Sequence, residues 1–298
     1  MKNKRNLIGL LLIVGFVLIS GCVEEKPEEK PSDSWAEIRA NDVAILSDGW
    51  SQPKRIEVSD DGWEDGVYIS SDGNTLYFVY YPGDILADLK AGKFKDDIDV
   101  YYSIKPFTSK KKHAISEDIW SEGGVMISGS DMYYMSNKPI DDNDKNYDDN
   151  IYKNGELLTF NTNQSEGDPH HCSAKNELYF WINKEEVTKE IYVYKNNHVS
   201  KLPEPINDGH ENIQPFLTPD CQTMYFTSNR DGGVLKIYKS QRLGEDSWSN
   251  PKIVVSSKYG VGEPTLTDDG KFLFFVQLFK SEDGNSSTTD IFYSEKLS

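Results

Sequence analysis

A motif of three adjacent apolar or aromatic residues recurs five times along the chain at nearly constant spacing. The copies begin at residues 76, 132, 178, 224 and 273, so the spacings are 56, 46, 46 and 49 residues. Each copy is followed by a second strand-like segment: DVYYS, NIYKN, EIYVYKN, KIYKS and DIFYS. Branched and aromatic residues between Asp, Gly and Pro turns predict short strands. A period of about 40 to 50 residues with four strands per unit is typical of a β-propeller.

Two similar segments at opposite ends of the array indicate how the ring closes. SWSNPKIV (247–254) follows the fourth copy, GWSQPKRI (49–56) precedes the first, and no such segment follows the fifth. We expect the N-terminal segment to join the last blade as its outer strand, because a closed ring leaves no unpaired edge. The predicted fold is all-β: a five-bladed β-propeller of four-stranded antiparallel blades over residues 43–298, closed by the N-terminal strand.

The repeat resembles the WD40-like propeller repeat of TolB-type proteins. The segments closest to that pattern are GEPTLTDDGKFLFF with TDIFYS, and IQPFLTPDCQTMYF with LKIYKS. The second and third repeats depart from it, since one lacks the proline and the Asp-Gly pair and the other has AKN at the turn. The resemblance covers the chain from about Asp48 onward. It implies a fold and carries no catalytic residue with it.

The first 22 residues have the pattern of an export signal. Basic residues at positions 2, 4 and 5 precede an apolar run from Leu7 to Ile19, which is shorter than the roughly 20 residues of a membrane-spanning helix. The sequence ISGC then resembles a lipobox. We expect residues 1–21 to be a lipoprotein signal peptide and Cys22 to carry the lipid; an uncleaved anchor or a plain signal peptide is the alternative. The folded part is therefore expected on the extracytoplasmic face of the cell membrane.

Residues 22–42 are charged and contain prolines, so we expect a disordered tether. The chain has a net charge of -17, which becomes -20 once three positive charges leave with the signal peptide. A protein with this net negative charge repels nucleic acid, so we expect no nucleic-acid partner. Acidity of this kind also keeps a protein soluble.

Carboxylates recur in four of the five loops that enter the innermost strands, and these loops open onto the central channel of a propeller. Three interpretations stay open: binding of a divalent cation, an acid and base pair, or the capping of turns. The residues predicted to form a ligand-binding funnel are Glu64, Asp65, Glu122, Glu166, Asp168, Gln214 and Glu263.

The function predicted from these features is a module that binds or scaffolds a protein, peptide or glycan, with no catalytic residue. The alternative is a glycoside hydrolase that uses Asp65, Asp168 and Glu263 across the funnel. In that alternative, Trp63 and Trp181 would be platforms for stacking sugars.

A possible calcium loop lies between two strands of the second repeat. Asp142, Asp144, Asn146 and Asp148 alternate as oxygen ligands do in calcium loops, but the glycine and glutamate of an EF-hand are missing. A solvated acidic loop is the other interpretation. No other cofactor is expected.

Two pairs of residues complete the predictions. Cys172 and Cys221 lie in neighbouring repeats, and they either form a disulfide or remain two isolated thiols. His170 and His171 are adjacent on a strand and therefore point to opposite faces. His171 occupies a position that is apolar in the other repeats, so we expect it in the core between blades; His170, near Asp168, is a candidate for the channel.

Overall fold

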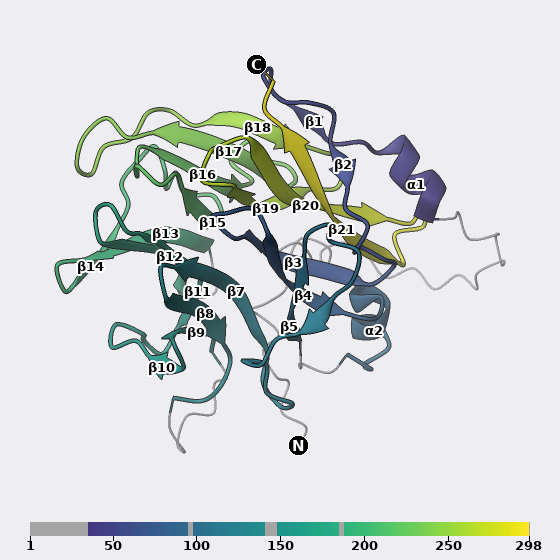
Figure 1. Cartoon of the computed structure of the whole chain (residues 1–298), viewed down its shortest axis with the longest axis horizontal. Coiled ribbons are helices and arrows are strands. Elements are labelled where there is room, and N and C mark those ends of the chain that lie inside the picture. Colours follow the sequence, from purple (N-terminus) through teal and green to yellow (C-terminus); the bar gives the residue numbers. More distant parts are fainter. Residues whose placement is uncertain (1–34, 95–97, 141–147, 185–187, 298) are drawn as a thin grey trace.

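The computed structural model describes residues 35–94, 98–140, 148–184 and 188–297, which form 21 strands and two short helices. The strands make five sheets arranged around a common centre, as Figure 1 shows. The innermost strands contact each other around the whole ring, because β3 touches β7, β7 touches β11, β11 touches β15, β15 touches β19, and β19 touches β3. The predicted all-β, five-bladed propeller is confirmed.

Each blade is an antiparallel sheet whose first three strands run outward in chain order. The innermost strands are β3 (Trp63–Ile69), β7 (Glu122–Ser128), β11 (Ser165–Cys172), β15 (Asn212–Leu217) and β19 (Val261–Leu266). The second strands, which contain the five predicted apolar triplets, are β4 (Thr75–Tyr81), β8 (Asp131–Ser136), β12 (Glu177–Lys184), β16 (Thr223–Ser228) and β20 (Phe272–Lys280). The third strands are β5 (Asp99–Ile104), β9 (Asn150–Lys153), β13 (Thr188–Lys195), β17 (Lys236–Gln241) and β21 (Ser287–Glu295).

The outer strands are short and come from two parts of the chain. Blades one to four use β6 (Lys111–Lys112), β10 (Glu156–Leu157), β14 (His198–Lys201) and β18 (Lys252–Ser256). In the fifth blade the outermost strand is β2 (Lys54–Arg55), which pairs with Tyr293 and Phe292 of β21. The fourth blade has one strand more than predicted, because β1 (Ile45–Leu46) pairs with β18.

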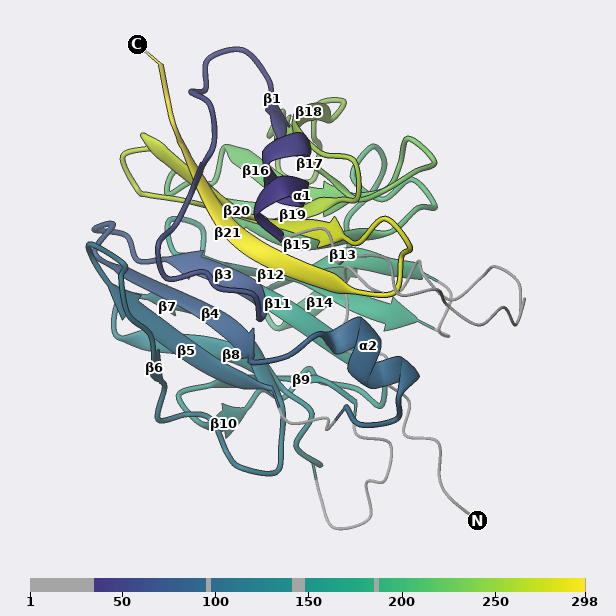
Figure 2. The same ribbon diagram turned by 90° about the vertical axis from the view of Figure 1, so that its right-hand side faces the viewer.

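The N-terminal helix α1 (Trp35–Asn41) corrects one prediction. Trp35 and Ile38 are three residues apart, so they share one helix face, and they pack against an apolar cluster that includes Phe275 and Phe279. Figure 2 shows α1 next to β20. The predicted disordered tether is therefore wrong for residues 35–42. Its remaining part, the signal peptide and Cys22 lie outside the described residues.

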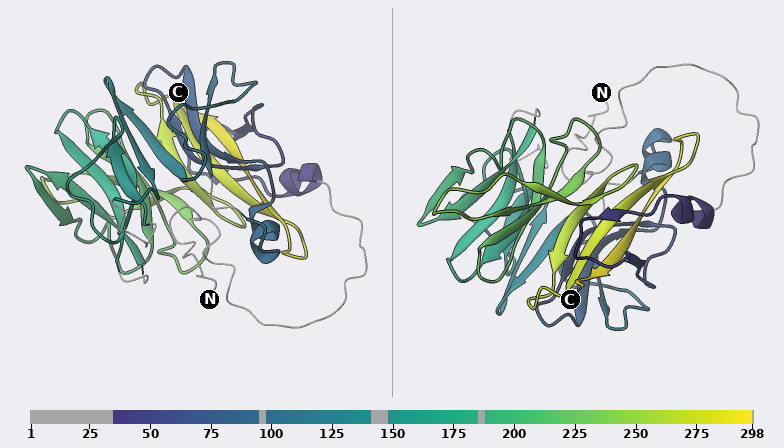
Figure 3. Two further views of the ribbon diagram at one scale, coloured as in Figure 1. Left: turned by 90° about the horizontal axis from the view of Figure 1, so that it is seen from below. Right: turned by 90° about the horizontal axis from the view of Figure 1, so that it is seen from above.

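Apolar clusters between adjacent blades hold the ring together. Between the first and fifth blades, Trp63, Leu76 and Phe78 pack in one cluster with Val276 and Ile291. Each such side chain contributes roughly 1.5 to 3 kcal/mol when it is fully buried. The described residues contain no helix that is both long and apolar enough to span a membrane. Figure 3 shows the blades from two opposite sides, with α2 (Ile85–Lys90) and α1 outside them.

Candidate functional site at the centre of the ring

Every innermost strand contains a β-bulge at the same position. The pairing with the second strand shifts there in all five blades, and one residue of each bulge has a positive φ. Glycine adopts this conformation without strain, but three blades hold a larger residue in it, so the ring must impose it. The five residues, with φ between 48° and 58°, are Gly66, Gly124, Asp168, Gln214 and Glu263.

The bulges bring side chains from four blades together around the axis. Gln214 donates its amide N–H to the Glu263 carboxyl and accepts the Glu263 backbone N–H at 3.0 Å. Asp65, next to the first bulge glycine, is hydrogen-bonded to Glu263. Trp181 donates its indole N–H to Asp168 Oδ2 at 2.6 Å. We call Asp65, Asp168, Gln214 and Glu263 the axial cluster.

The axial carboxyls hold protons more strongly than exposed ones. Burial raises the pKa of Asp65 to about 6, and burial together with the negative charge of Asp65 raises the pKa of Asp168 to about 7. The pKa of Glu263 is raised well above its usual value by burial and by both aspartates. A proton must lie between Asp65 and Glu263, because two ionised carboxylates cannot donate a hydrogen bond to each other.

Lys189 supplies a buried positive charge beside these carboxyls. Burial lowers the pKa of its ammonium group, and the carboxylates of Glu211, Asp149, Asp168 and Asp65 oppose that shift. Its Nζ lies 4.5 Å from the centre of the Trp181 ring. Sequence reasoning missed Lys189, because the aligned position has no single character. Ile98 and Leu235 are apolar there, but Asp149 in the second blade and Thr289 in the fifth are polar.

The space at the axis is small. The cavity lined by Asp168, Gln214 and Glu263 has a volume of about 40 Å³. This suffices for a water molecule, whereas sites for small organic ligands have volumes of roughly 300 to 1,000 Å³. Trp63 and Trp181 are fully buried, so neither offers a face to a sugar, contrary to what the hydrolase alternative expected.

Three glutamates of the predicted funnel have a different arrangement. Glu64 accepts the backbone N–H of Asp60, Glu122 accepts that of Glu117, and Glu166 accepts that of Thr162, at 3.1 to 3.2 Å. Each carboxylate thus binds the loop that leads into its own strand, as in the turn-capping interpretation. Burial raises the pKa of both Glu122 and Glu166 to about 7.

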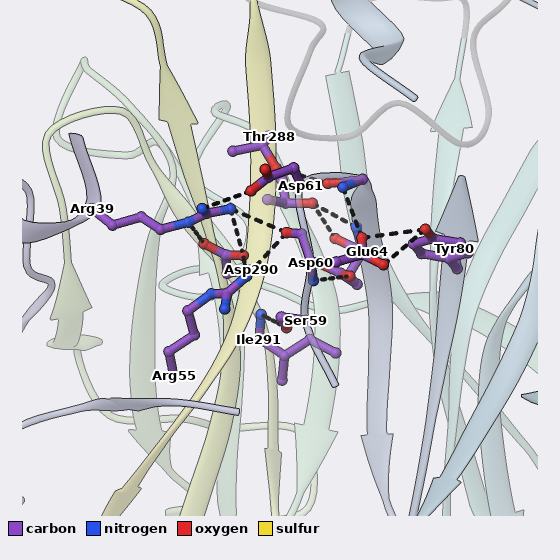
Figure 4. Close-up of polar contacts among 12 residues, drawn as sticks. Arg39, Arg55, Ser59, Asp60, Asp61, Glu64, Tyr80, Thr288, Asp290 and Ile291 are labelled. Atoms are coloured by element: carbon purple, nitrogen blue, oxygen red, sulfur yellow. Dashed lines mark hydrogen bonds and ion pairs between the residues drawn. The ribbon is translucent and has the colours of Figure 1, made fainter. Parts of the chain in front are cut away.

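The loop around Glu64 adjoins a cluster of charges from the N-terminal segment, shown in Figure 4. Asp290 on β21 is fully buried, and its two oxygens accept hydrogen bonds from Arg39 of α1 and from Arg55 of β2. Both arginines also donate to the carbonyl oxygen of Asp60. The N-terminal segment is therefore tied both to the last blade and to the entry of the first.

The two adjacent histidines lie in different surroundings. His170 is buried, its Nε2 is 3.1 Å from the Leu217 carbonyl, and burial lowers its pKa to about 3. His171 does lie between blades, as predicted, but it is only half-buried, and its Nδ1 is 2.8 Å from Ser128 Oγ. A core position was predicted for His171, but His170 is the histidine that is buried.

The remaining predicted sites divide between described and undescribed residues. Cys172 and Cys221 form a disulfide with their Cα atoms 6.0 Å apart. Of the possible calcium ligands, Asp142, Asp144 and Asn146 lie outside the described residues, and only Asp148 lies within them. Within the described ranges, no group of three or more His, Cys, Asp or Glu side chains is arranged to hold a metal ion.

A larger groove lies between the first and fifth blades, with a volume of about 840 Å³. Phe107, Phe272, Phe274 and Tyr293 form its aromatic part, and Lys54 and Lys105 are among its charged lining residues. Neither the repeat pattern nor the carboxylate positions indicated it, because it depends on how Phe107 packs against Phe274 of the fifth blade.

No protein-family model matches the sequence, and no curated protein matches it. Among solved structures, TolB from Acinetobacter baumannii is 13% identical with a TM-score of 0.49, and the match covers 80% of this chain and 57% of that one. A putative TolB from Agrobacterium tumefaciens is 16% identical with a TM-score of 0.47, covering 86% and 90% of the two chains. A thermostable family-43 glycoside hydrolase is 15% identical with a TM-score of 0.50, covering 80% and 91%.

These likenesses concern the fold alone, because all the identities are low. The chain is a five-bladed β-propeller, and its structural neighbours include TolB-type β-propellers.

Proposed function

We propose that this protein is a binding or scaffolding module that holds a protein, peptide or glycan partner. A lipid on Cys22 anchors it to the membrane on the extracytoplasmic side. The observation that supports binding most directly is the groove between the first and fifth blades, whose volume of about 840 Å³ lies within the range of ligand sites.

The lining of the groove suits a ligand with both apolar and polar groups. Phe107 and Phe274 are buried and form a firm apolar base, while Phe272 and Tyr293 remain partly exposed. Lysines and carboxylates line the same groove, and Asp268 is one of them. Aromatic side chains with charged neighbours are typical of the energetically important part of a binding surface.

The second candidate function is glycoside hydrolysis, favoured by the meeting of Asp65, Asp168 and Glu263 from three blades. Two observations weigh against it. The carboxyl groups of Asp65 and Glu263 are hydrogen-bonded, so they lie closer than the roughly 5 to 9.5 Å that separates the two carboxyls of a glycosidase. The axial cavity of about 40 Å³ also leaves no room for a sugar ring.

Partner binding can be tested with the full chain in detergent-solubilised membranes. Lys105→Glu and Phe272→Ala change the groove, and Leu243→Ala changes an exposed apolar residue of the fourth blade as a control. We expect crosslinked partners to be lost from both groove variants and kept by the control. Protease or glycosidase treatment of the bound material then identifies its class. Equal binding by all four proteins would exclude the groove.

The hydrolase candidate has its own test, a screen of glycan hydrolysis with Asp65→Asn, Asp168→Asn and Glu263→Gln. Activity that any one of these changes abolishes would overturn the binding proposal. For the anchor, Cys22→Ser should move the protein from the membrane fraction to the soluble fraction, because two acyl chains are needed for stable attachment. Retention of the variant in membranes would contradict lipid attachment at Cys22.

A further inference from the structure

The end of the central channel away from the axial cluster opens into a pocket of about 220 Å³. Its lining includes Ser128, the last residue of β7, and His171 on β11, so these two residues come from neighbouring blades. Asn176 lies in the turn between β11 and β12, beside the same histidine. None of Ser128, His171 and Asn176 lines the groove between the first and fifth blades, and none belongs to the axial cluster.

The three side chains form a continuous hydrogen-bonded chain. His171 Nδ1 is 2.8 Å from Ser128 Oγ, and His171 Nε2 is 3.3 Å from Asn176 Oδ1. An amide oxygen can only accept, so Nε2 must carry the ring proton of the neutral imidazole. Nδ1 is then the unprotonated nitrogen, and the Ser128 hydroxyl donates to it. This is the tautomer that a histidine needs in order to remove a proton from serine.

The imidazole is also held in place by packing. The ring of His171 stacks on Tyr133 of β8, with centroids 5.3 Å apart and an angle of 21° between the planes. On the other side of Ser128, Gly129 has a φ of 62°, and no atom lies within 4 Å of where its Cβ would be. Ser128 and Gly129 both line the pocket, so a carbonyl compound bound there lies next to the serine.

We propose that Ser128, His171 and Asn176 form a nucleophile, a general base and a positioning residue that hydrolyse a small acyl ester. This activity goes beyond partner binding and does not depend on it. The order of roles follows the logic of serine and cysteine hydrolases, in which a third polar group fixes the base. The pocket is smaller than a typical ligand site, which restricts the substrate to a short acyl group.

The reaction balances without any cofactor. Ser128 Oγ bonds to the carbonyl carbon while its proton passes to His171 Nδ1, and the ester C–O bond then breaks as the leaving alcohol takes that proton. Water next attacks the acyl-serine and gives a proton to Nδ1. The acid leaves, and the proton returns to Ser128 Oγ, so the enzyme is restored.

The test uses the folded mature chain, a fluorophosphonate probe with peptide mapping of the label, and p-nitrophenyl acetate as substrate. We expect the label on Ser128 and none on Ser128→Ala. His171→Phe keeps a ring on Tyr133 but removes the base, so labelling and hydrolysis should fall by about 100-fold or more. Ser173→Ala changes another hydroxyl of the same pocket and should stay within about two-fold of the wild type.

Asn176 requires a separate comparison, since it acts through His171. Asn176→Ala should lower the hydrolysis rate, and Asn176→Asp should restore it, because a carboxylate also accepts the Nε2 proton. Thermal unfolding of each variant shows whether it is folded. The proposal is overturned if the folded wild type takes no label, if the label is on another residue, or if His171→Phe reacts as fast as the wild type.

Discussion

The carboxyl groups of Asp65 and Glu263 are hydrogen-bonded to each other at the centre of the ring, although they come from the first and fifth blades. The bond requires a shared proton, and burial keeps that proton in place near neutral pH. The hydrogen bond between these two blades therefore depends on a proton, and raising the pH removes that proton and the bond with it.

Replacing Asp65 by asparagine should make the protein relatively more stable as the pH rises from 4 to 7. A carboxyl whose pKa is raised in the folded state stabilises that state fully below its unfolded pKa of about 4. This stabilisation is lost as the pH rises through the folded pKa, which is about 6 for Asp65. The amide does not ionise, so Asp65→Asn avoids the loss. Melting temperatures at half-unit steps of pH measure the difference between variant and wild type.

The control for this experiment is Asp118→Asn, since the side chain of Asp118 is 95% exposed. Its melting temperature should follow that of the wild type at every pH. A constant difference between Asp65→Asn and the wild type over the whole range would show that Asp65 does not titrate in this window.

Arg39→Ala should lower the free energy of unfolding by about 1 to 3 kcal/mol, because it leaves a buried Asp290 oxygen with fewer donors. In an Asp290→Asn background the same change should cost less than about 1 kcal/mol, since the charge is gone. Urea unfolding of the two single variants and the double variant measures this coupling. Equal losses in both backgrounds would mean that Arg39 acts through packing of α1 alone.

Gly124→Ala should destabilise the ring more than Gly270→Ala, although both glycines have a positive φ, of 56° and 66°. A Cβ on Gly124 would lie 3.0 Å from Asp168 Oδ1 and 3.2 Å from its Cα, whereas nothing lies within 4 Å of a Cβ on Gly270. Both substitutions put an alanine at a positive φ, so they cause similar backbone strain. The difference between the melting temperatures of the two variants therefore measures the crowding at the axis. Equal losses would contradict the close approach of the second and third blades.

Replacing both Cys172 and Cys221 by alanine should lower the free energy of unfolding by about 2 to 4 kcal/mol, because the bond closes a loop of 49 residues. Denaturant titration with and without reducing agent measures this. Reducing agent should destabilise the wild type and leave the double variant unchanged. A wild type that is insensitive to reduction would be inconsistent with the bond.

The repeat made the number of blades predictable, since Leu76, Met132, Leu178, Met224 and Leu273 all begin the triplets of second strands. Each blade buries its second strand in the same way, so apolar residues recur at the same interval in the sequence. α1 was not predictable in the same way, because Trp35 and Ile38 lie in a segment whose average composition is charged. Two apolar residues and the ion pair between Arg39 and Asp290 dock this short helix, and average composition does not detect them.

The candidate site was predictable in part. The sequence identified Asp65, Asp168, Gln214 and Glu263 as loop residues near the channel, and the structure brings them together. The sequence could not show that Asp65, and not the adjacent Glu64, belongs to the axial cluster. A β-bulge decides which of the two side chains turns to the axis. Contacts between blades, such as that of Ser128 with His171, depend on packing that a repeat pattern does not contain.

The pairing of β2 with β21 also has a consequence for biosynthesis. Arg55 and its partner Asp290 are 235 residues apart, so ribosomes finish almost the entire chain before the earliest strands meet their neighbours. Contacts so distant in sequence form slowly. Until the fifth blade forms, first-blade side chains that pack against it, such as Trp63 and Phe78, lack those partners, and apolar surface exposed in this way promotes aggregation.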